Sequence, residues 1–134
     1  MIRAVVAGAA GRMGSRILAA LRAEKDFAVV SAFERQGSDI VGRPVDGVTV
    51  RGSIEEALES GADVVVDFTA PPASVQHARA CAAKGVALVV GTTGLSAEQK
   101  AELAAAAKRI ALVGFIRSSG SFGTGLFSSL AWST

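Results

Sequence analysis

The stretch Gly8-Ala-Ala-Gly11-Arg-Met-Gly14 places three glycines between an apolar run and a helical pattern. The run before it, Ile2–Ala7, is short and nearly all apolar, as in a strand covered on both faces. The pattern after it, over Arg12–Glu24, predicts a helix whose apolar stripe is formed by Met13, Ile17, Leu18 and Leu21. A glycine loop in this position lets the backbone turn tightly and brings the free amides of a helix N-terminus close to a pyrophosphate. The loop therefore predicts phosphate binding, and the competing interpretation is a turn that needs its glycines only for packing.

The rest of the chain repeats this alternation of strand and helix. Further strands are expected over Ala28–Phe33, Val48–Val50, Val64–Phe68, Val86–Val90 and Ile110–Val113. Further helices are expected over Ile54–Ser60, Pro72–Lys84 and Ala97–Lys108. Helix starts and stops are marked by capping-box patterns at Ser53 and Ser96 and by glycines at Gly61 and Gly85. Short links between alternating strands and helices predict an α/β fold with a doubly wound parallel sheet of the Rossmann type.

Length and composition indicate one folded domain followed by a different C-terminal segment. With 134 residues, 50% hydrophobic and 19% charged, the chain fits a single compact domain and is short for a two-domain enzyme. We expect a dinucleotide-binding domain over residues 1–113, followed over residues 114–134 by a Gly/Ser-rich tail with a partial helix from Leu126. Because this tail ends without a helix stop signal, we expect the chain to be truncated.

Composition also narrows the classes of function. No apolar stretch reaches the roughly 18 residues that a membrane span needs, and the N-terminus lacks the layout of a secretory signal, so we expect a cytoplasmic protein with no membrane partner. The basic residues are scattered, which argues against nucleic-acid binding. One histidine and one cysteine cannot supply a zinc site, so no metal is expected. His77 is expected at the surface or boundary of its helix with no catalytic role, and Cys81 in the core.

The ends of three predicted strands carry the other candidate binding residues. Glu34 lies 20 residues beyond Gly14, where a carboxylate accepts hydrogen bonds from the ribose hydroxyls of an adenosine. Arg35, together with Arg12, offers a partner for a 2′-phosphate, so both NADH and NADPH are expected to bind. The alternative for this pair is a solvated charged turn. Two later strands end in Asp67-Phe-Thr-Ala-Pro-Pro72 and in Gly91-Thr-Thr-Gly94, at the edge of the sheet where ligands sit. Backbone groups of Gly91–Thr93 are expected to contact the nicotinamide amide, and the alternative for each loop is an ordinary strand-to-helix turn.

Four motifs together carry a resemblance to a known family. They are, in order, Gly8-Ala-Ala-Gly-Arg-Met-Gly14, Glu34-Arg35, Val66-Asp-Phe-Thr69 and Val90-Gly-Thr-Thr-Gly94. This series resembles the bacterial 4-hydroxy-tetrahydrodipicolinate reductases (dihydrodipicolinate reductases) of the lysine and diaminopimelate pathway, over residues 1 to about 113. The resemblance implies NADH or NADPH as cofactor, hydride transfer to a cyclic dicarboxylated substrate to give tetrahydrodipicolinate, and a homotetramer. The cofactor contacts that it implies fall on Gly8, Ala9, Ala10, Gly11, Arg12, Met13, Glu34, Arg35, Gly91, Thr92 and Thr93.

The chain also departs from the family pattern. Where the family has an Asn-[Phe/Met]-Ser-x-Gly segment after its sixth strand, this chain has Ser118-Ser-Gly-Ser-Phe-Gly-Thr-Gly125. The family's histidine-rich segment, lysine and Pro-Ser-Gly-Thr loop, which belong to its C-terminal α+β substrate domain, have no counterpart in these 134 residues. We therefore assign no catalytic residue and expect the chain to bind dinucleotide weakly and to turn over no substrate alone. The alternative is a free-standing Rossmann module that senses redox state or binds another adenosine ligand, such as coenzyme A or S-adenosylmethionine, without catalysis; a pure interaction scaffold is a further possibility.

Overall fold

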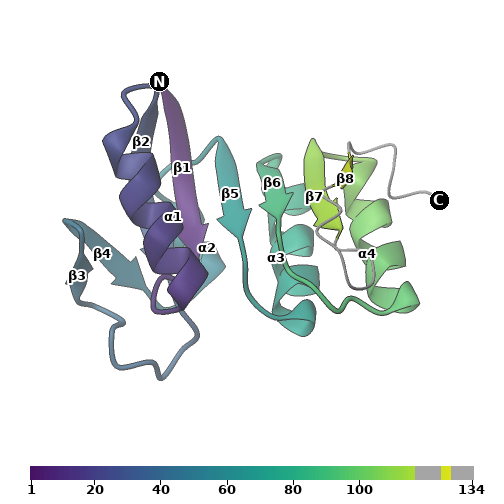
Figure 1. Ribbon diagram of the computed structural model, residues 1–134, viewed down its shortest axis with the longest axis horizontal. Coiled ribbons are helices and arrows are strands. Elements are labelled where there is room, and N and C mark those ends of the chain that lie inside the picture. Colours follow the sequence, from purple (N-terminus) through teal and green to yellow (C-terminus); the bar gives the residue numbers. More distant parts are fainter. Residues whose placement is uncertain (117–124, 128–134) are drawn as a thin grey trace.

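The computed structural model describes residues 1–116 and 125–127 of the chain (Figure 1). Its elements in chain order are β1 (Ile2–Ala7), α1 (Arg12–Ala23), β2 (Phe27–Phe33), β3 (Pro44–Val45), β4 (Val48–Arg51), α2 (Ile54–Leu58), β5 (Val64–Asp67), α3 (Pro71–Lys84), β6 (Ala87–Val90), α4 (Ala97–Ala107), β7 (Leu112–Ile116) and β8 (Gly125–Phe127). The strands form one sheet in the order β3-β4-β2-β1-β5-β6-β7-β8.

The sheet is doubly wound, as the alternation of strands and helices predicts. All neighbouring pairs from β4 to β7 are parallel, and only the edge pairs β3·β4 and β7·β8 are antiparallel. The chain builds outward from β1 through β2 to β4, then returns to the other side of β1 and builds β5, β6 and β7. The winding direction therefore reverses between β1 and β5. The carboxyl ends of these two strands form the topological switch point at which such sheets bind ligands.

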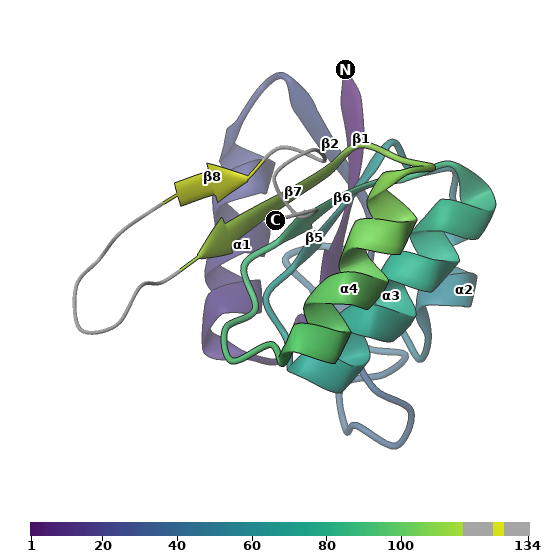
Figure 2. The same cartoon turned by 90° about the vertical axis from the view of Figure 1, so that its right-hand side faces the viewer.

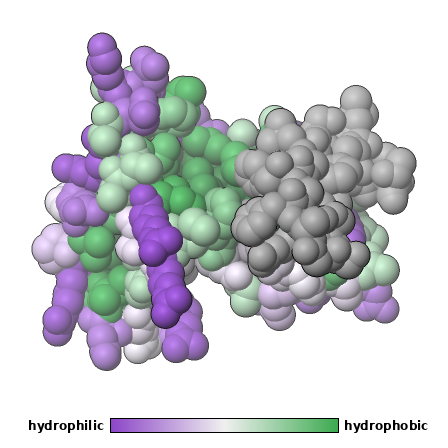
Figure 3. Space-filling model, viewed as in Figure 1, coloured by the Kyte–Doolittle hydropathy of each residue, from purple (hydrophilic) through white to green (hydrophobic). Residues whose placement is uncertain are grey.

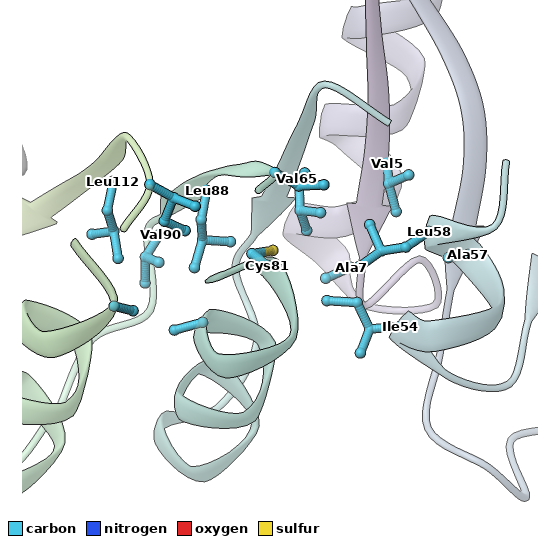
Figure 4. Close-up of a cluster of buried hydrophobic side chains, with 14 of the residues drawn as sticks. Val5, Ala7, Ile54, Ala57, Leu58, Val65, Cys81, Leu88, Val90 and Leu112 are labelled. Atoms are coloured by element: carbon cyan, nitrogen blue, oxygen red, sulfur yellow. The ribbon is translucent and has the colours of Figure 1, made fainter. Parts of the chain in front are cut away.

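Helices cover the two faces of the sheet unequally. Helix α1 packs on one face over β1 and β2, whereas α2, α3 and α4 lie on the other face (Figures 1 and 2). The smaller core cluster, beneath α1, consists of Val6, Ala9, Leu18, Ala32, Val48 and Val50. The larger cluster, beneath α2 to α4, includes Val5 and Ala7 of β1 and buried side chains from all three of these helices (Figure 4). Beside α1, over β1 and β5, apolar residues reach the surface (Figure 3).

Local signals in the sequence mark several of the helix ends. Ser96 forms a complete capping box with Gln99, and Gly85 ends α3 in the left-handed conformation at φ 69°. Ser53 accepts a hydrogen bond from the Glu56 amide, which is one half of the box predicted there. Helix α3 begins at Pro71, one residue earlier than predicted, because proline suits the first turn of a helix. The helices and strands that the sequence predicts over residues 2–113 are all present, and their ends differ from the predicted ones by at most three residues.

Three expectations are wrong in detail. Met13 is 47% exposed instead of lying in the apolar stripe of α1; it belongs to the first turn of that helix, directly after the glycine loop. The final parallel strand, predicted over Ile110–Val113, starts at Leu112 and runs to Ile116. Leu126 begins no helix: it pairs within β8 with Phe115 of β7, where the open edge of the sheet offers backbone partners. The other parts of the predicted tail and partial helix lie outside the described residues.

The described residues contain neither a membrane-spanning helix nor a cluster of metal-binding side chains. No helix in the described ranges has the length and apolar character needed to cross a membrane. Among the same residues, no three histidine, cysteine or acidic side chains gather in a way that could hold a metal ion.

Candidate functional site

A cavity of ≈ 670 Å³ lies at the carboxyl ends of β1, β2 and β5. Its walls come from the loop after β1, the end of β2, the start of α2, the loop after β5 and the first turns of α3. These segments meet at the switch point of the sheet, where the doubly wound fold places its ligands. The volume lies in the range of small-molecule and cofactor sites, so this cavity is the candidate site.

The wall after β1 is made of backbone. Gly8 has φ +71°, a left-handed conformation that favours glycine, and a Cβ there would lie 2.8 Å from the Cγ2 of Thr69. A Cβ on Gly14 would overlap the carbonyl of Gly8, so only glycine allows α1 to pack this closely on the loop. These contacts give a steric reason for two of the three glycines that the sequence singles out.

The N-terminus of α1 differs from those of α2 and α4 in its cap. Gly11 is the N-cap and makes no side-chain hydrogen bond, and the first turn carries no acidic residue. Ser53 and Ser96, by contrast, each use a side-chain oxygen to accept a hydrogen bond from an amide of their own helix. Helix α1 therefore lacks the cap that would occupy its first amides, and its positive end is suited to an anion that enters the cavity.

The predicted loop residues divide into two groups. Gly8, Ala10 and Gly11 line the cavity, as the phosphate-binding hypothesis requires. Ala9 is buried beneath α1, and its amide donates a 3.3 Å hydrogen bond to the carbonyl of Phe33, so it holds the loop on β2. The remaining two predicted loop residues, Arg12 and Met13, are exposed and lie outside the described lining of the cavity.

Glu34 lies on the cavity wall at the end of β2 and is held by backbone donors. Its Oε2 accepts a hydrogen bond from the Ala10 amide at 2.9 Å, and its Oε1 accepts one from the Arg35 amide at 3.1 Å. The carboxylate thus joins the glycine loop to β2 and faces the cavity. Arg35 also lines the cavity and is exposed, so its guanidinium is accessible to a charged ligand group.

The segment Gly91–Thr93 follows β6 and lies outside the described lining of the cavity. A Cβ on Gly91 would overlap the ring of Phe68, which itself lines the cavity. Thr92 is buried, and its Oγ1 accepts hydrogen bonds from the Thr69 amide at 3.0 Å and from the Ser74 hydroxyl at 2.7 Å. Thr93 is exposed. In this structure Gly91 and Thr92 thus support the loop after β5 from behind.

A buried polar cluster at the end of β5 is the feature that the sequence analysis missed. Asp67 has no exposed surface, and its Oδ2 lies 2.9 Å from the Nδ1 of His77. Its Oδ1 accepts a 2.6 Å hydrogen bond from the hydroxyl of Thr69. His77 and Thr69 line the cavity, and His77 is only 8% exposed, so the surface or boundary position predicted for it is wrong.

One signal in the sequence points to this cluster. Asp67 ends a run of three valines, which places a carboxylate on a strand that is otherwise apolar. His77 shares its helix face with Ser74, Ala78 and Cys81, at spacings of three and four residues. All four of these residues are buried against the sheet. An acidic strand end followed by a helix that carries a single imidazole is compatible with a buried Asp–His pair, although the mostly small side chains of α3 mark its inward face only weakly.

Cys81 is the small core residue that the sequence predicts, with no exposed surface. Burial, and to a smaller extent the charge of Asp67, raises the pKa of its thiol to about 12. The thiol therefore stays protonated at neutral pH and takes no part in nucleophilic chemistry.

Comparison with known proteins assigns the fold and the glycine loop to a family. The family described as dihydrodipicolinate reductase, N-terminus, matches residues 2–118. The chain belongs to this family. The resemblance stated from the four motifs is thereby confirmed.

Curated relatives of the family agree with this assignment. The 4-hydroxy-tetrahydrodipicolinate reductase of Anaeromyxobacter dehalogenans is 47% identical over 121 residues, which cover 84% of this chain and 44% of the relative. The enzyme of the same name from Myxococcus xanthus is 48% identical over 123 residues, with 84% and 45% covered. The chain thus spans less than half the length of these relatives.

Solved structures show the shared fold. The dipicolinate-bound dihydrodipicolinate reductase from Paenisporosarcina sp. TG-14 superposes with a TM-score of 0.71 at 23% identity, covering 86% of this chain and 47% of that one. An amine dehydrogenase from Mycobacterium smegmatis superposes with a TM-score of 0.65 at 30% identity, covering 84% and 38%. Each similarity covers more than four-fifths of this chain and less than half of the other one.

Proposed function

We propose that this chain is the NAD(P)H-binding domain of a 4-hydroxy-tetrahydrodipicolinate reductase, acting in the lysine and diaminopimelate pathway in the cytoplasm. The observation that carries the proposal is the cavity at the switch point, where the uncapped N-terminus of α1 lies beside Glu34. Family membership over residues 2–118 supports the same assignment. The cofactor class, a reduced pyridine dinucleotide, follows from the family and from these two groups together.

The residues present fit a dinucleotide. Gly8 and Gly14 let the loop, Thr69 and the start of α1 pack closely together. The first amides of α1, from Arg12 and Met13, are the donors for the pyrophosphate. Glu34 accepts from the ribose hydroxyls of the adenosine, since each carboxylate oxygen can accept a second hydrogen bond. Arg35 pairs with the 2′-phosphate when NADPH is bound, so both cofactors are accepted.

The nicotinamide end is assigned to the loops after β5 and β6. Gly91 and Thr93 contribute backbone groups at this end, and Thr92 holds the two loops together through the bonds described above. When bound, the reduced nicotinamide supplies a hydride for the cyclic dicarboxylated substrate. Positioning and charge stabilisation of that substrate require further groups, and none is assigned among residues 1–116. We therefore expect dinucleotide binding by the 134-residue chain and no turnover by it alone.

A ligand titration tests the proposal. Isothermal titration of the purified chain with NADH, NADPH, coenzyme A and S-adenosylmethionine is expected to give the tightest binding for one of the two nicotinamide cofactors. Tighter binding of either of the other two ligands would favour a free-standing nucleotide-binding module and contradict the proposal. Binding of none of the four would favour an interaction scaffold.

A substitution at the rim of the cavity tests the shared use of NADH and NADPH. Arg35→Ala is expected to weaken NADPH binding about tenfold more than NADH binding, because only NADPH carries the 2′-phosphate. Arg43→Ala is the matched control, since Arg43 is an exposed arginine outside the described lining of the cavity. Equal losses for the two cofactors in Arg35→Ala would refute the role of this guanidinium.

A further inference from the structure

The second wall of the cavity depends on one buried carboxylate. Asp67 has no exposed surface, and each of its two oxygens bonds a different residue of the wall: Oδ1 accepts from the Thr69 hydroxyl, and Oδ2 lies 2.9 Å from His77 Nδ1. Thr69 belongs to the loop after β5, and His77 belongs to the second turn of α3. Both of these residues line the cavity, whereas Asp67 lies behind them.

The chemistry of a carboxylate fixes the direction of both bonds. An ionised carboxylate only accepts, so the proton of the imidazole must lie on Nδ1, and the Thr69 hydroxyl must use its proton on Asp67. When the imidazole carries only this one proton, Nε2 is left as an acceptor, and His77 makes no hydrogen bond from Nε2 to the described residues. The oxygen of Thr69 likewise keeps lone pairs but has no proton to offer.

Neighbouring contacts hold these groups in place. The His77 ring packs edge-on against Phe33, with centroids 4.9 Å apart and planes at 85°. The Thr69 amide donates to Thr92 Oγ1, which also accepts from the Ser74 hydroxyl. Hydrogen bonds thus join the ends of β5 and β6 to α3.

We infer that Asp67 is a positioning residue of the cofactor cavity: it holds His77 in the tautomer protonated at Nδ1 and turns the Thr69 hydroxyl into an acceptor. This wall then presents acceptors to the N–H and O–H donors of a bound dinucleotide, opposite the amide donors of the glycine loop. The inference rests on the proposed function, since it assigns the wall to the same ligand. Asp67 itself acts only through His77 and Thr69.

The single histidine of the chain makes the tautomer directly measurable. Nitrogen-15 NMR of the imidazole is expected to show the proton on Nδ1 in the wild-type chain. Asp67→Asn keeps the shape of the side chain but places an amide donor beside Nδ1, which moves the proton to Nε2. We expect this variant to bind NADH and NADPH about tenfold more weakly, because the acceptor on the ring is lost.

A matched control tests whether the effect of Asp67→Asn depends on the position of the carboxylate or only on the loss of one negative charge. Asp63→Asn makes the same chemical change just before the start of the same strand, at an exposed residue paired with Arg3. It is expected to leave both the His77 tautomer and the dinucleotide affinity unchanged.

A second pair of variants keeps the test valid if Asp67→Asn fails to fold. Thr69→Val removes the hydroxyl at nearly constant volume and is expected to lower dinucleotide affinity about tenfold. Thr69→Ser restores the hydroxyl and is expected to recover affinity to within about twofold of wild type. If Thr69 had a purely structural role, Thr69→Val would lower the thermal unfolding temperature, and Thr69→Ser would not recover the dinucleotide affinity.

The possible outcomes are distinct. Nε2 protonation in the wild type, or an Asp67→Asn variant that switches tautomer yet binds as tightly as wild type, would overturn the inference and leave the proposed function intact. Equal binding by Thr69→Val and wild type would overturn it as well. A wild-type chain that binds neither dinucleotide would refute the proposed function, and the role of this wall in cofactor binding with it.

Discussion

The two walls of the cavity differ in the groups that form them, which are backbone groups in one wall and polar side chains in the other. The wall formed by Gly8–Gly14 is backbone: glycines without side chains, followed by a helix start with no side-chain cap. The wall behind Phe68–Ala70 is a cluster of buried polar side chains, with Asp67 at its centre. The first wall offers donors and the positive end of a helix, and the second offers acceptors. A dinucleotide, with anionic phosphates and with amino and hydroxyl donors, matches both.

The difference between the walls also shows how each tolerates change. A backbone wall fails by steric overlap, because any added atom occupies the space that the helix or the ligand needs. A wall of buried hydrogen bonds fails when one partner is removed and another is left unsatisfied. The predictions below test each mode of failure, from the largest expected effect to the smallest.

The largest effect is expected in the backbone wall. In Gly14→Ala the new Cβ overlaps the carbonyl of Gly8, so α1 must move away from the loop. We expect dinucleotide affinity to fall by more than about a hundredfold and stability by about 2–4 kcal/mol, measured by titration and urea unfolding. The control is Gly85→Ala at the end of α3, where φ is +69° and a Cβ would meet nothing within 4 Å. That variant is expected to lose only about 1 kcal/mol of stability and no affinity.

The reactivity of Cys81 tests whether water is excluded from the region behind the wall of buried polar side chains. Burial and the nearby charge of Asp67 raise the pKa of this thiol from 9.0 to about 12, so its thiolate is scarce at pH 8. Alkylation of the folded chain is expected to be slower than that of the urea-unfolded chain by about a hundredfold. Equal rates in the two states would show that water enters behind this wall.

The same raised pKa predicts a pH dependence of stability. Because the folded thiol holds its proton more tightly than the unfolded one, its contribution is fully present below about pH 9. It is lost as the pH rises from 9.0 toward 12. Cys81→Ala should remove this part of the alkaline decline in unfolding free energy.

The bond that joins the two strand-end loops is tested at Thr92. Thr92→Val keeps the shape of the side chain but leaves the Thr69 amide and the Ser74 hydroxyl without their acceptor. We expect a loss of about 1–3 kcal/mol in urea unfolding. Thr93→Val, at the exposed neighbouring position, is expected to change stability by less than about 0.5 kcal/mol.

The smallest effect on the free energy of unfolding is expected at Ser31, in contrast to Thr92. Among the described residues, the Ser31 hydroxyl is a buried side-chain oxygen without a hydrogen-bond partner. Ser31→Ala is therefore expected to leave stability unchanged or raise it by up to about 1 kcal/mol, as seen in urea unfolding. If Ser31→Ala lowered the free energy of unfolding as much as Thr92→Val does, the contribution of a buried hydroxyl to stability would not depend on its having a hydrogen-bond partner.

The two walls differ in how far the sequence predicts them. The glycine loop is local: strand, turn and helix follow one another within 23 residues, and the steric needs of Gly8 and Gly14 appear as glycines in the sequence. Glu34 was also predictable, because its distance along the chain from the loop follows from the length of one helix and one strand.

The polar wall joins residues far apart in the chain. The Thr69 amide bonds a residue 23 positions later, and no local pattern specifies that contact. The inward position of His77 depends on the rotation of α3 against the sheet, which its mostly small side chains mark only weakly. The edge strands β3 and β8 are short and gain their pairing from a neighbouring strand instead of from their own sequence.

The central claim is that the amides at the start of α1 bind the pyrophosphate of a dinucleotide, and a residue-resolved NMR titration tests it most directly. Addition of NADH to the nitrogen-15-labelled chain is expected to shift the amide signals of residues 10–14 most strongly, with smaller shifts at Glu34, Arg35 and Thr69. Saturable binding that leaves the signals of residues 10–14 unmoved, while signals far from the cavity shift, would contradict the claim.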